Sequence, residues 1–292
     1  MRELCYIHSG KSVTVKTVLQ NHFCLSRASV SALKNSGGIS VNGENVTVRR
    51  ELSEGDRLTL KFFDKPCEII PTNMDIDILY EDEDILVVNK PCGIPTHPSR
   101  GHYTDTLANG ICYYYRNENF VFRAVNRLDR ETSGIVVIAK NKNSAHNLGE
   151  QIKKNAVKKV YYAVITGEPN EKSGEINAPI ARIDGMKRGV RNDGKYALTK
   201  YKVIASDGGH TLLEIMPVTG RTHQIRVHLS HIGCPILGDS LYGNGKDRLY
   251  LHCGKMTFSH PVSGEIITLN CPPKNWFRLY MHNTYNKKIQ LN

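Results

Sequence analysis

The sequence places an aspartate, Asp129, where a carboxylate could do chemistry. In AVNRLDRETSGIVVIAK (residues 124–140), Asp129 lies between Arg127 and Arg130, a few residues before an apolar run. Nearby guanidinium groups favour the ionised form of a carboxylate, which suits a nucleophile or an electrostatic stabiliser better than a general acid. No second carboxylate is paired with Asp129, which argues against an ordinary two-carboxylate glycoside hydrolase. Spacing alone still favours a simpler interpretation, an aspartate that caps a turn.

An arginine and a tyrosine mark two further segments. In MPVTGRTHQIRVHLSHIGCPILGDSLYG (residues 216–243), Arg221 stands where a predicted strand ends and a predicted helix begins, a usual place for groups that handle anions. On the same predicted helix, Arg226 and His228 have ordinary interpretations as a surface cation and a buried, hydrogen-bonded histidine. In KKVYYAVITGEP (residues 158–169), Tyr161 alternates with apolar residues, which is typical of the packed face of a strand.

Neither the cysteines nor the histidines form the pattern of a metal site. The eight cysteines are at positions 5, 24, 67, 92, 112, 234, 253 and 271, and no two lie within four positions of each other. The paired ligands of a structural zinc site are therefore missing, and we expect reduced, mostly buried thiols. The cluster of His223, His228 and His231 has no carboxylate to complete a ligand set. The sequence predicts no metal.

Charge is distributed unevenly along the chain. Lys and Arg number 39 against 28 Asp and Glu in 292 residues, a net charge of +11, and residues 93–292 alone hold 28 cations and 15 acids. Such a basic field indicates a polyanionic partner, most often nucleic acid, although it also serves solubility alone. The longest apolar run, residues 160–165, is far too short for a membrane span, and the first residues lack the apolar stretch of a signal peptide. We expect a cytoplasmic protein.

Residues 12–62 are predicted to form a small unit of their own. Two short helices are expected at 17–22 and 26–33, the second with Ser26 as its N-cap. The Asn42-Gly43 pair predicts a hairpin, and residues 58–60 a last strand. About fifty residues bury only a modest core, which suits a binding module better than a catalyst. The proline-containing segment 63–73 is predicted to be the linker.

The longer second region is predicted to be a mixed α+β domain. It opens with a hairpin of strands 78–80 and 85–88, and the all-apolar run 135–139 predicts a strand buried on both faces. Further strands are expected at 161–165, 200–204, 212–216 and 265–269, and helices near 104–115, 143–154 and 222–232. Long polar loops join these elements, and chemistry is expected there.

The first region resembles the αL RNA-binding motif typified by ribosomal protein S-four. The resemblance rests on LSRASVSALKNSGGISVNGENV and LSEGDRLTL and places an αL domain at residues 12–65. It implies that the second helix and the following loop face RNA, with Arg27 and Lys34 on phosphates and Ser26 and Asn35 nearby. A solvated helix face that binds nothing is the competing interpretation for any one of these side chains.

The second region is similar to the RluA-type pseudouridine synthases. NRLDRETSG, KVYYAV and TGRTHQIRVHL match the three hallmark segments in order, and ILYEDEDILVVNKPCGIPTHP and LHCGKMTFSHP match as well. The resemblance implies a catalytic domain over residues 76–290, built around a bent mixed or antiparallel sheet. It also implies that Asp129 is the catalytic aspartate, Tyr161 the active-site tyrosine, Arg221 the partner of the aspartate and Arg127 the arginine beside the flipped nucleotide. Asn126 stands where the family usually has His, from which we expect altered loop support rather than lost activity.

The implied activity is the isomerisation of uridine to pseudouridine in structured RNA. This change is redox-neutral, so it needs neither a redox cofactor nor a metal. Large-subunit ribosomal RNA is the expected substrate class, with transfer RNA as an alternative, and a monomer is expected. Two other functions compete: a non-catalytic RNA-binding or ribosome-assembly protein on the same fold, and a hydrolase. The first would have a degenerate set of catalytic residues, and the second would show a metal set, a phosphate loop or paired carboxylates.

Overall fold

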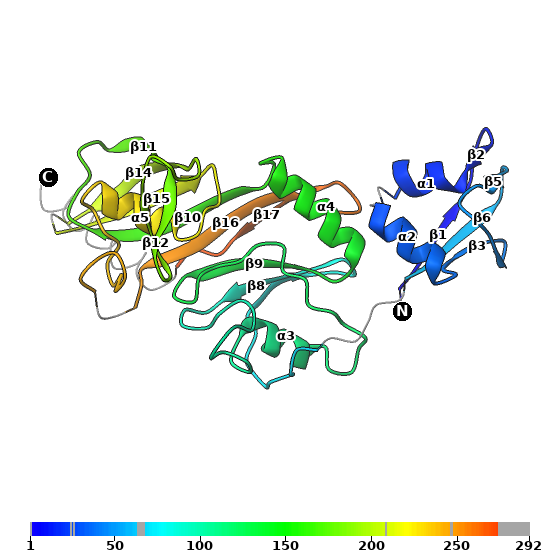
Figure 1. Cartoon of the computed structure of the whole chain (residues 1–292), viewed down its shortest axis with the longest axis horizontal. Helices are drawn as coiled ribbons and strands as arrows, with labels where there is room; N and C mark the ends of the chain where they lie inside the picture. The colour runs from blue at the N-terminus through cyan, green and yellow to red at the C-terminus, as the bar shows by residue number, and fades with distance from the viewer. Residues whose placement is uncertain are drawn as a thin grey trace, which may run out of the picture.

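The first part of the chain folds into a small unit of two helices and a four-stranded sheet. The computed structural model describes residues 2–23, 25, 27–62, 68–207, 209–245 and 248–273. The elements of the unit are β1 (Arg2–Ile7), β2 (Val13–Thr14), α1 (Val15–Asn21), α2 (Arg27–Asn35), β3 (Ile39–Val41), β4 (Glu44–Asn45), β5 (Glu51–Leu52) and β6 (Arg57–Phe62). The sheet order is β1-β6-β3-β4, and β2 pairs with β5. Figure 1 shows this unit at one end of the molecule.

The predicted helices and hairpin of this unit are found, with one element added. Strand β1 pairs antiparallel with β6 from Arg2 to Ile7, so the sheet begins ten residues before the predicted boundary at residue 12. The helices share a buried core with the sheet, to which Leu19, Leu33 and Leu60 contribute. The N-cap predicted at Ser26 and part of the predicted linker lie outside the described residues.

The second region contains a large mixed sheet, as predicted. Its strands are β7 (Ile78–Glu81), β8 (Ile85–Lys90), β9 (Ser133–Ala139), β10 (Lys158–Thr166), β11 (Ser173–Asn177), β14 (Leu198–Ser206), β15 (His210–Pro217), β16 (Leu251–Ser259) and β17 (Ile266–Asn270). The order is β11-β14-β15-β10-β16-β9-β8-β7, with β17 beside β16. One pair, β9 with β16, is parallel. A separate hairpin, β12 (Ile180–Asp184) and β13 (Lys187–Val190), lies outside this sheet.

In the described part of the second region, three helices pack on the large sheet. They are α3 (Leu107–Tyr114), α4 (Lys142–Lys153) and α5 (Gln224–His231). Figure 1 shows β8 and β9 between α3 and α4, and all seven residues of β9 are buried. The prediction of a strand covered on both faces is therefore confirmed. No helix among the described residues is long and apolar enough to cross a membrane.

Strand β16 divides the large sheet into two halves. One edge pairs with β10, while the other pairs first with β9 and then with β17. The β9 contact brings the Gly134 Cα against the backbone of Cys253, where a Cβ atom would lie 2.3 Å from the Cys253 carbonyl oxygen. Two buried clusters result, one around β8 and β9 and one around β15 and α5, and Tyr161 on β10 packs against both.

Candidate active site

The loop that carries Asp129 is held by hydrogen bonds on both sides of that residue. Thr96 Oγ1 donates to the Leu128 carbonyl at 2.9 Å and accepts from the Leu128 amide at 3.2 Å. The Arg130 carbonyl accepts from the Gly93 amide at 2.9 Å. The residues before and after Asp129 are thereby fixed, while its side chain remains 34% exposed. The loop presents a carboxylate to the outside on a rigid backbone.

Asn126 ties the start of this loop to β9. Its Nδ2 donates to the Ile135 carbonyl at 3.1 Å, and its Oδ1 accepts from the Val137 amide at 2.9 Å. The side chain is buried, so both bonds are shielded from water. The residue that departs from the family pattern is therefore fully engaged in loop support.

Lys90, at the end of β8, is a fully buried lysine beside the same loop. Its Nζ donates to the carbonyl oxygens of Pro91, Ile94 and Arg130, at 2.9, 2.8 and 3.1 Å. Burial lowers the pKa of Lys90 to about 8, although the Cys92 thiol and the Asp129 carboxylate counteract this shift. The ammonium group joins two loops and adds positive charge next to Asp129.

The imidazole ring of His223 faces the carboxylate of Asp129. Its Nε2 lies 3.9 Å from Asp129 Oδ2, and its Nδ1 lies 2.8 Å from the Tyr242 hydroxyl. Its backbone is left-handed, with φ of 57°, a conformation uncommon outside glycine and often stored at functional sites. Burial lowers the pKa of His223, while Asp129 raises it, so the ring is neutral at pH 7.

Arg226, in the first turn of α5, supplies the buried positive charge of the site. It is 6% exposed and forms two bonds of 2.7 Å with Asp239, from Nε and Nη2. Burial opposes the charge, but the hydrogen bond to Asp239 and the charges of Asp239 and Asp129 raise the pKa of Arg226. The interpretation of Arg226 as a surface cation is therefore wrong, because the side chain is buried. A buried guanidinium group needs a partner such as Asp239.

Arg221 does not lie where the resemblance placed it. Its exposed side chain donates from Nε to the Tyr196 carbonyl at 2.9 Å, and no ion pair with Asp129 forms within the described part of the chain. Arg221 precedes α5, whereas Arg226 lies one turn further and points inward. Arg226 lies within electrostatic reach of Asp129, although neither arginine forms an ion pair with Asp129 among the described residues.

Tyr161 lies in the middle of the large sheet. It pairs with Ile215 of β15 on one side and with Cys253 of β16 on the other, next to a bulge in β10. Burial raises the pKa of the Tyr161 phenol well above its usual value, and Cys253 and Asp129 raise it further. The hydroxyl is therefore protonated at neutral pH, and Tyr161 offers a flat, neutral ring near Asp129.

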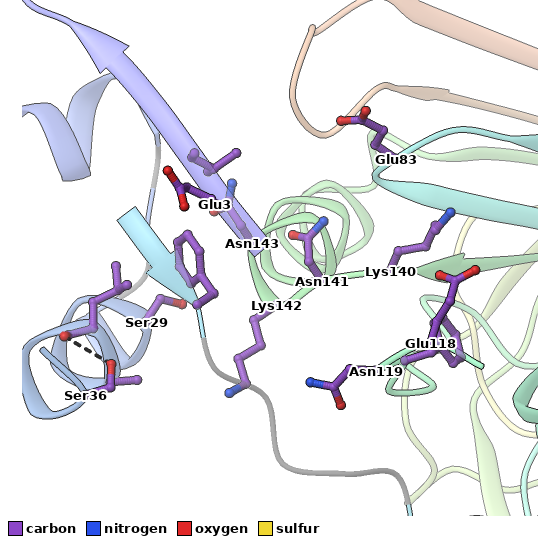
Figure 2. Close-up of a pocket in the computed structure, with 15 residues that line it drawn as sticks. Glu3, Ser29, Ser36, Glu83, Glu118, Asn119, Lys140, Asn141, Lys142 and Asn143 are labelled. Atoms are coloured by element: carbon purple, nitrogen blue, oxygen red, sulfur yellow. Dashed lines mark hydrogen bonds between the residues drawn. The ribbon is translucent and has the colours of Figure 1, made fainter. Parts of the chain in front are cut away.

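The predicted RNA-binding side chains lie on exposed parts of the surface. Arg127 is exposed and its charge acts on His97, while Arg27, Lys34 and Asn35 are exposed on α2. Ser26 lies outside the described residues. The opposite face of α2 borders a cavity of about 410 Å³ that Figure 2 shows, with Ser29 and Ser36 on its wall. Because positions 27 and 34 are two turns apart, both basic residues share the face away from this cavity.

One group of possible metal ligands occurs in the described part of the chain. Asp82, Asp84 and His260 place one ligand atom each within 4.8 Å of one another. Their oxygens also serve as acceptors: Asp82 Oδ1 accepts from the amides of Asp84 and Ile85 at 2.7 and 2.8 Å. Asp84 Oδ1 accepts from Asn141 Nδ2 at 2.9 Å. These bonds fix the turn between β7 and β8.

Comparison with known proteins identifies the family. A sequence model described as RNA pseudouridylate synthase matches residues 84–231, the segment that contains Asp129, Tyr161 and Arg226. The chain belongs to this family. It is an RNA pseudouridine synthase.

Curated relatives and solved structures agree with this assignment. An uncharacterized RNA pseudouridine synthase of Bacillus subtilis is 40% identical over 256 residues, which cover 83% of this chain and 85% of the relative. Ribosomal large subunit pseudouridine synthase D of Xanthomonas campestris is 36% identical over 87% of this chain and 83% of its own length. The structure of human RNA pseudouridylate synthase domain containing 4 matches with a TM-score of 0.59 and 28% identity, over 70% of this chain and 92% of the human one.

The sequence-based reasoning assigned no role at the site to Lys90, His223, Arg226 or Asp239. Arg226 was interpreted as an ordinary surface cation, yet six residues of α5 in a row, 224–229, are buried. Asp239 was not considered as a partner. The signal available was Val227, an apolar residue on the side of α5 opposite Ile225 and Leu229, since a helix buried all round forces any arginine in it to be paired.

Proposed function

We propose that this synthase modifies uridines in large-subunit ribosomal RNA and that Asp129 is its catalytic carboxylate. The observation that carries the proposal is the presentation of Asp129, whose neighbours Leu128 and Arg130 are both held by hydrogen bonds while its carboxylate is accessible. Rigid positioning of an accessible anion is what a reaction at a sugar carbon requires. The name of the Xanthomonas relative supports this RNA class; transfer RNA is the alternative.

The reaction proposed for Asp129 is an isomerisation in which all atoms of uridine are kept. The bond between ribose C1′ and uracil N1 breaks, the base turns, and a bond forms between C1′ and uracil C5. The proton on C5 leaves, and N1 gains one. Positive charge develops at C1′ when the first bond breaks, and the Asp129 carboxylate stabilises it through space or as a covalent adduct.

Arg226 and His223 are proposed to provide the charge and the steric limits around the Asp129 carboxylate. Arg226 is fixed by Asp239 and lies within electrostatic reach of Asp129, so it holds a positive charge close to the proposed catalytic carboxylate. His223 is neutral and lies 3.9 Å from the carboxylate, so it limits where the carboxylate can turn without neutralising it. This assignment replaces Arg221 as the arginine partner of the aspartate.

Tyr161 is proposed to hold the detached uracil. A base stacked on an aromatic ring gains about 1–3 kcal/mol, which keeps the base close while it turns. A neutral phenol is a weak base, so stacking and hydrogen bonding are the roles that suit Tyr161 better than removal of the C5 proton.

The approach of the RNA is proposed to depend on exposed cations. Flipping the target base out of its stack costs a few kcal/mol, and Arg127, which is exposed two residues before Asp129, can occupy the gap. The small unit at residues 12–65, extended by β1, is proposed to bind RNA through Arg27, Lys34, Ser26 and Asn35, and residues 76–290 to form the catalytic domain. The enzyme is proposed to act as a monomer.

The test is Asp129→Asn with a matched control. Asn keeps the size of the side chain and removes its charge, so the variant should fold and bind RNA but form no pseudouridine. Asp193→Asn, which removes an exposed carboxylate paired with Arg191, should be active. Mapping pseudouridines in total RNA of cells with and without the gene then identifies the RNA. Turnover by purified Asp129→Asn would contradict the assignment of the aspartate. Loss of pseudouridines only from transfer RNA in cells without the gene would contradict the ribosomal substrate.

A further inference from the structure

Arg248 is an exposed arginine whose guanidinium group is attached to a buried chain of hydrogen bonds. The residue lies just before β16 and is exposed, and its Nη2 donates to Ser133 Oγ at 3.3 Å. Ser133 Oγ lies 2.8 Å from His252 Nδ1, and His252 Nε2 lies 2.6 Å from the Cys271 carbonyl oxygen. Ser133 and His252 are each 4% exposed.

The direction of every bond in this chain is determined. A carbonyl oxygen only accepts, so His252 Nε2 carries the hydrogen that points to Cys271. His252 Nδ1 is then an acceptor for the Ser133 hydroxyl, whose oxygen accepts from Arg248. Burial lowers the pKa of His252 to about 4, although the bond to Cys271 counteracts this, so the ring is neutral at pH 7. The chain therefore works as a fixed support for Arg248.

The support places Arg248 close to the candidate active site. Ser133 is the first residue of β9 and follows Asp129 by four positions. The charge of Arg248 also acts on the thiol of Cys92, in the loop that follows Lys90. Lys90 itself lies within electrostatic reach of both Cys92 and Asp129. Arg248 thus lies where the two segments that hold the Asp129 loop meet.

Within the described residues, Arg248 uses little of its hydrogen-bonding capacity. A guanidinium group has five N–H donors, and in the described part of the chain the one acceptor found for Arg248 is Ser133. No carboxylate of that part pairs with it, whereas the exposed Arg130 and Arg191 pair with Glu131 and Asp193. A fixed cation with open donors suits the planar, bidentate recognition of a phosphate group.

We infer that Arg248 binds a backbone phosphate of the RNA at or next to the target nucleotide, and that Ser133 and His252 are positioning residues for it. The inference rests on the proposed catalytic role of Asp129, because only that role brings the RNA backbone to this place. Lysine would be a poor substitute, since a single ammonium group cannot hold both Ser133 and a phosphate in the same plane.

The experiment is single-turnover kinetics of Arg248→Gln on a structured RNA substrate. Loss of one charge-assisted bond should raise the half-saturating enzyme concentration about tenfold or more, with a saturating rate within about twofold of the wild type. The slope of log affinity against log salt should become shallower by about 0.7–0.9, the effect of one phosphate. Arg116→Gln is the control, because Arg116 is also exposed and donates to one carbonyl, that of Tyr113. It should leave both quantities unchanged.

A substrate with single methylphosphonate linkages identifies the phosphate. Neutralising the right one should weaken the wild type and leave Arg248→Gln unaffected. Ser133→Ala should weaken binding less than Arg248→Gln, and the double variant should be no weaker than Arg248→Gln alone. If Arg248→Gln has the affinity and the salt slope of the wild type, the inference is overturned. A lowered saturating rate with normal binding also overturns it, because Arg248 would then only hold the structure together. If Asp129→Asn is inactive in the same assay, either result leaves the proposed function intact; if Asp129→Asn is active, the proposed function itself fails.

Discussion

The guanidinium group of Arg226 and the carboxylate of Asp239 form a bidentate ion pair in the interior of the catalytic region, with both N–O distances at 2.7 Å. Asp239 is itself immobilised, because its Oδ1 also accepts from the amides of Leu241 and Tyr242 at 2.9 and 3.0 Å. The pair therefore holds the guanidinium group of Arg226 at a fixed place within electrostatic reach of Asp129.

The first prediction separates the two arginines of the TGRTHQIR segment. Arg226→Lys should lower the saturating rate by tenfold or more and lower the free energy of unfolding by about 1–3 kcal/mol, because an ammonium group cannot form both bonds to Asp239. Arg221→Lys should have near-normal stability and rate, since Arg221 makes one bond to a carbonyl at the surface. Single-turnover kinetics and urea denaturation measure the two quantities. A larger loss of rate in Arg221→Lys than in Arg226→Lys would reverse the assignment.

The second prediction concerns pH and the buried Lys90. As pH rises through its pKa of about 8, the side chain loses its charge and one of its three N–H donors, so one carbonyl of the two loops loses its partner. The saturating rate should therefore fall with a midpoint near pH 8. In Lys90→Met this fall in rate should be absent, and the saturating rate should be lower than that of the wild type and independent of pH in that range. If the fall persists in Lys90→Met, it belongs to another titrating group.

Stability should change in the opposite direction over the same range. The pKa of Lys90 in the folded protein, about 8, lies below the usual value of 10.5. Between these two values the unfolded chain binds more protons than the folded one, so this group raises the free energy of unfolding as pH increases. Urea denaturation at several pH values, compared with Lys90→Met, measures its contribution.

The third prediction tests the support of the Asp129 loop. Asn126→Ala removes two bonds to the buried backbone of β9, which should cost about 1–3 kcal/mol of unfolding free energy and lower the saturating rate about tenfold or more, since small displacements of a catalytic group are costly. Asn147→Ala is the control: it removes one bond from α4 to the Pro261 carbonyl and should cost stability without a change in rate. Asn126→Ala with a normal rate would show that the loop keeps its place without this side chain.

Much of the fold could be predicted from the sequence, because local patterns specify it. The hairpin of β7 and β8, the buried β9 and the helices α3 to α5 occur where the apolar spacing predicted them, with ends that differ by a few residues. Asp129 and Tyr161 could be singled out because their motifs are contiguous. The prediction of a mixed α+β domain with a large sheet is confirmed.

What could not be predicted depends on contacts between distant segments. Strand β16 was missed because Gly254 and Lys255 interrupt its pattern, although it is the strand on which the sheet divides. Strand β1 was missed because its partner β6 lies about fifty residues later. Arg226 was misplaced because its burial depends on Asp239, thirteen residues further along the chain. Pairings of this kind leave little trace in local composition.

The fourth prediction concerns Tyr161, which packs against both buried clusters of the large sheet. Tyr161→Phe keeps the ring and should lie within about 1 kcal/mol of the wild type in unfolding free energy, whereas Tyr161→Ala should lose about 3 kcal/mol or more through the cavity it leaves. Tyr161→Phe should also retain more activity than Tyr161→Ala, because stacking survives. Tyr162→Ala, one residue on and packed against a different cluster, should lose stability but keep its rate. Equal rates in Tyr161→Phe and Tyr161→Ala would contradict a stacking role.

The fifth prediction concerns the small N-terminal unit. A truncated protein that begins at Glu68 should fold and keep its saturating rate, with a raised half-saturating concentration. The starting point matters, because Ile69 packs against the catalytic core and the Ile70 carbonyl accepts from Asn109 Nδ2 at 2.8 Å. A truncation at Pro71 would therefore destabilise the catalytic region and confuse the result. If the Glu68 protein folds and binds normally but its saturating rate collapses, the unit contributes to the active site itself.

Neutralising the exposed cations of α2 tests the same RNA-binding role of the N-terminal unit more directly. Arg27→Gln with Lys34→Gln removes two cations from one exposed face of α2 and should make the salt slope shallower by about 1.4–1.8, the effect of two phosphates, without changing the saturating rate. Arg49→Gln with Arg50→Gln removes the same charge from exposed positions between β4 and β5 and serves as the control. A uniform attraction to RNA would weaken both pairs equally, because long-range attraction depends on net charge. If α2 contacts RNA directly, only the variant with Arg27→Gln and Lys34→Gln should bind RNA more weakly. An equal loss of RNA affinity in both double variants would remove the reason to assign RNA binding to this face.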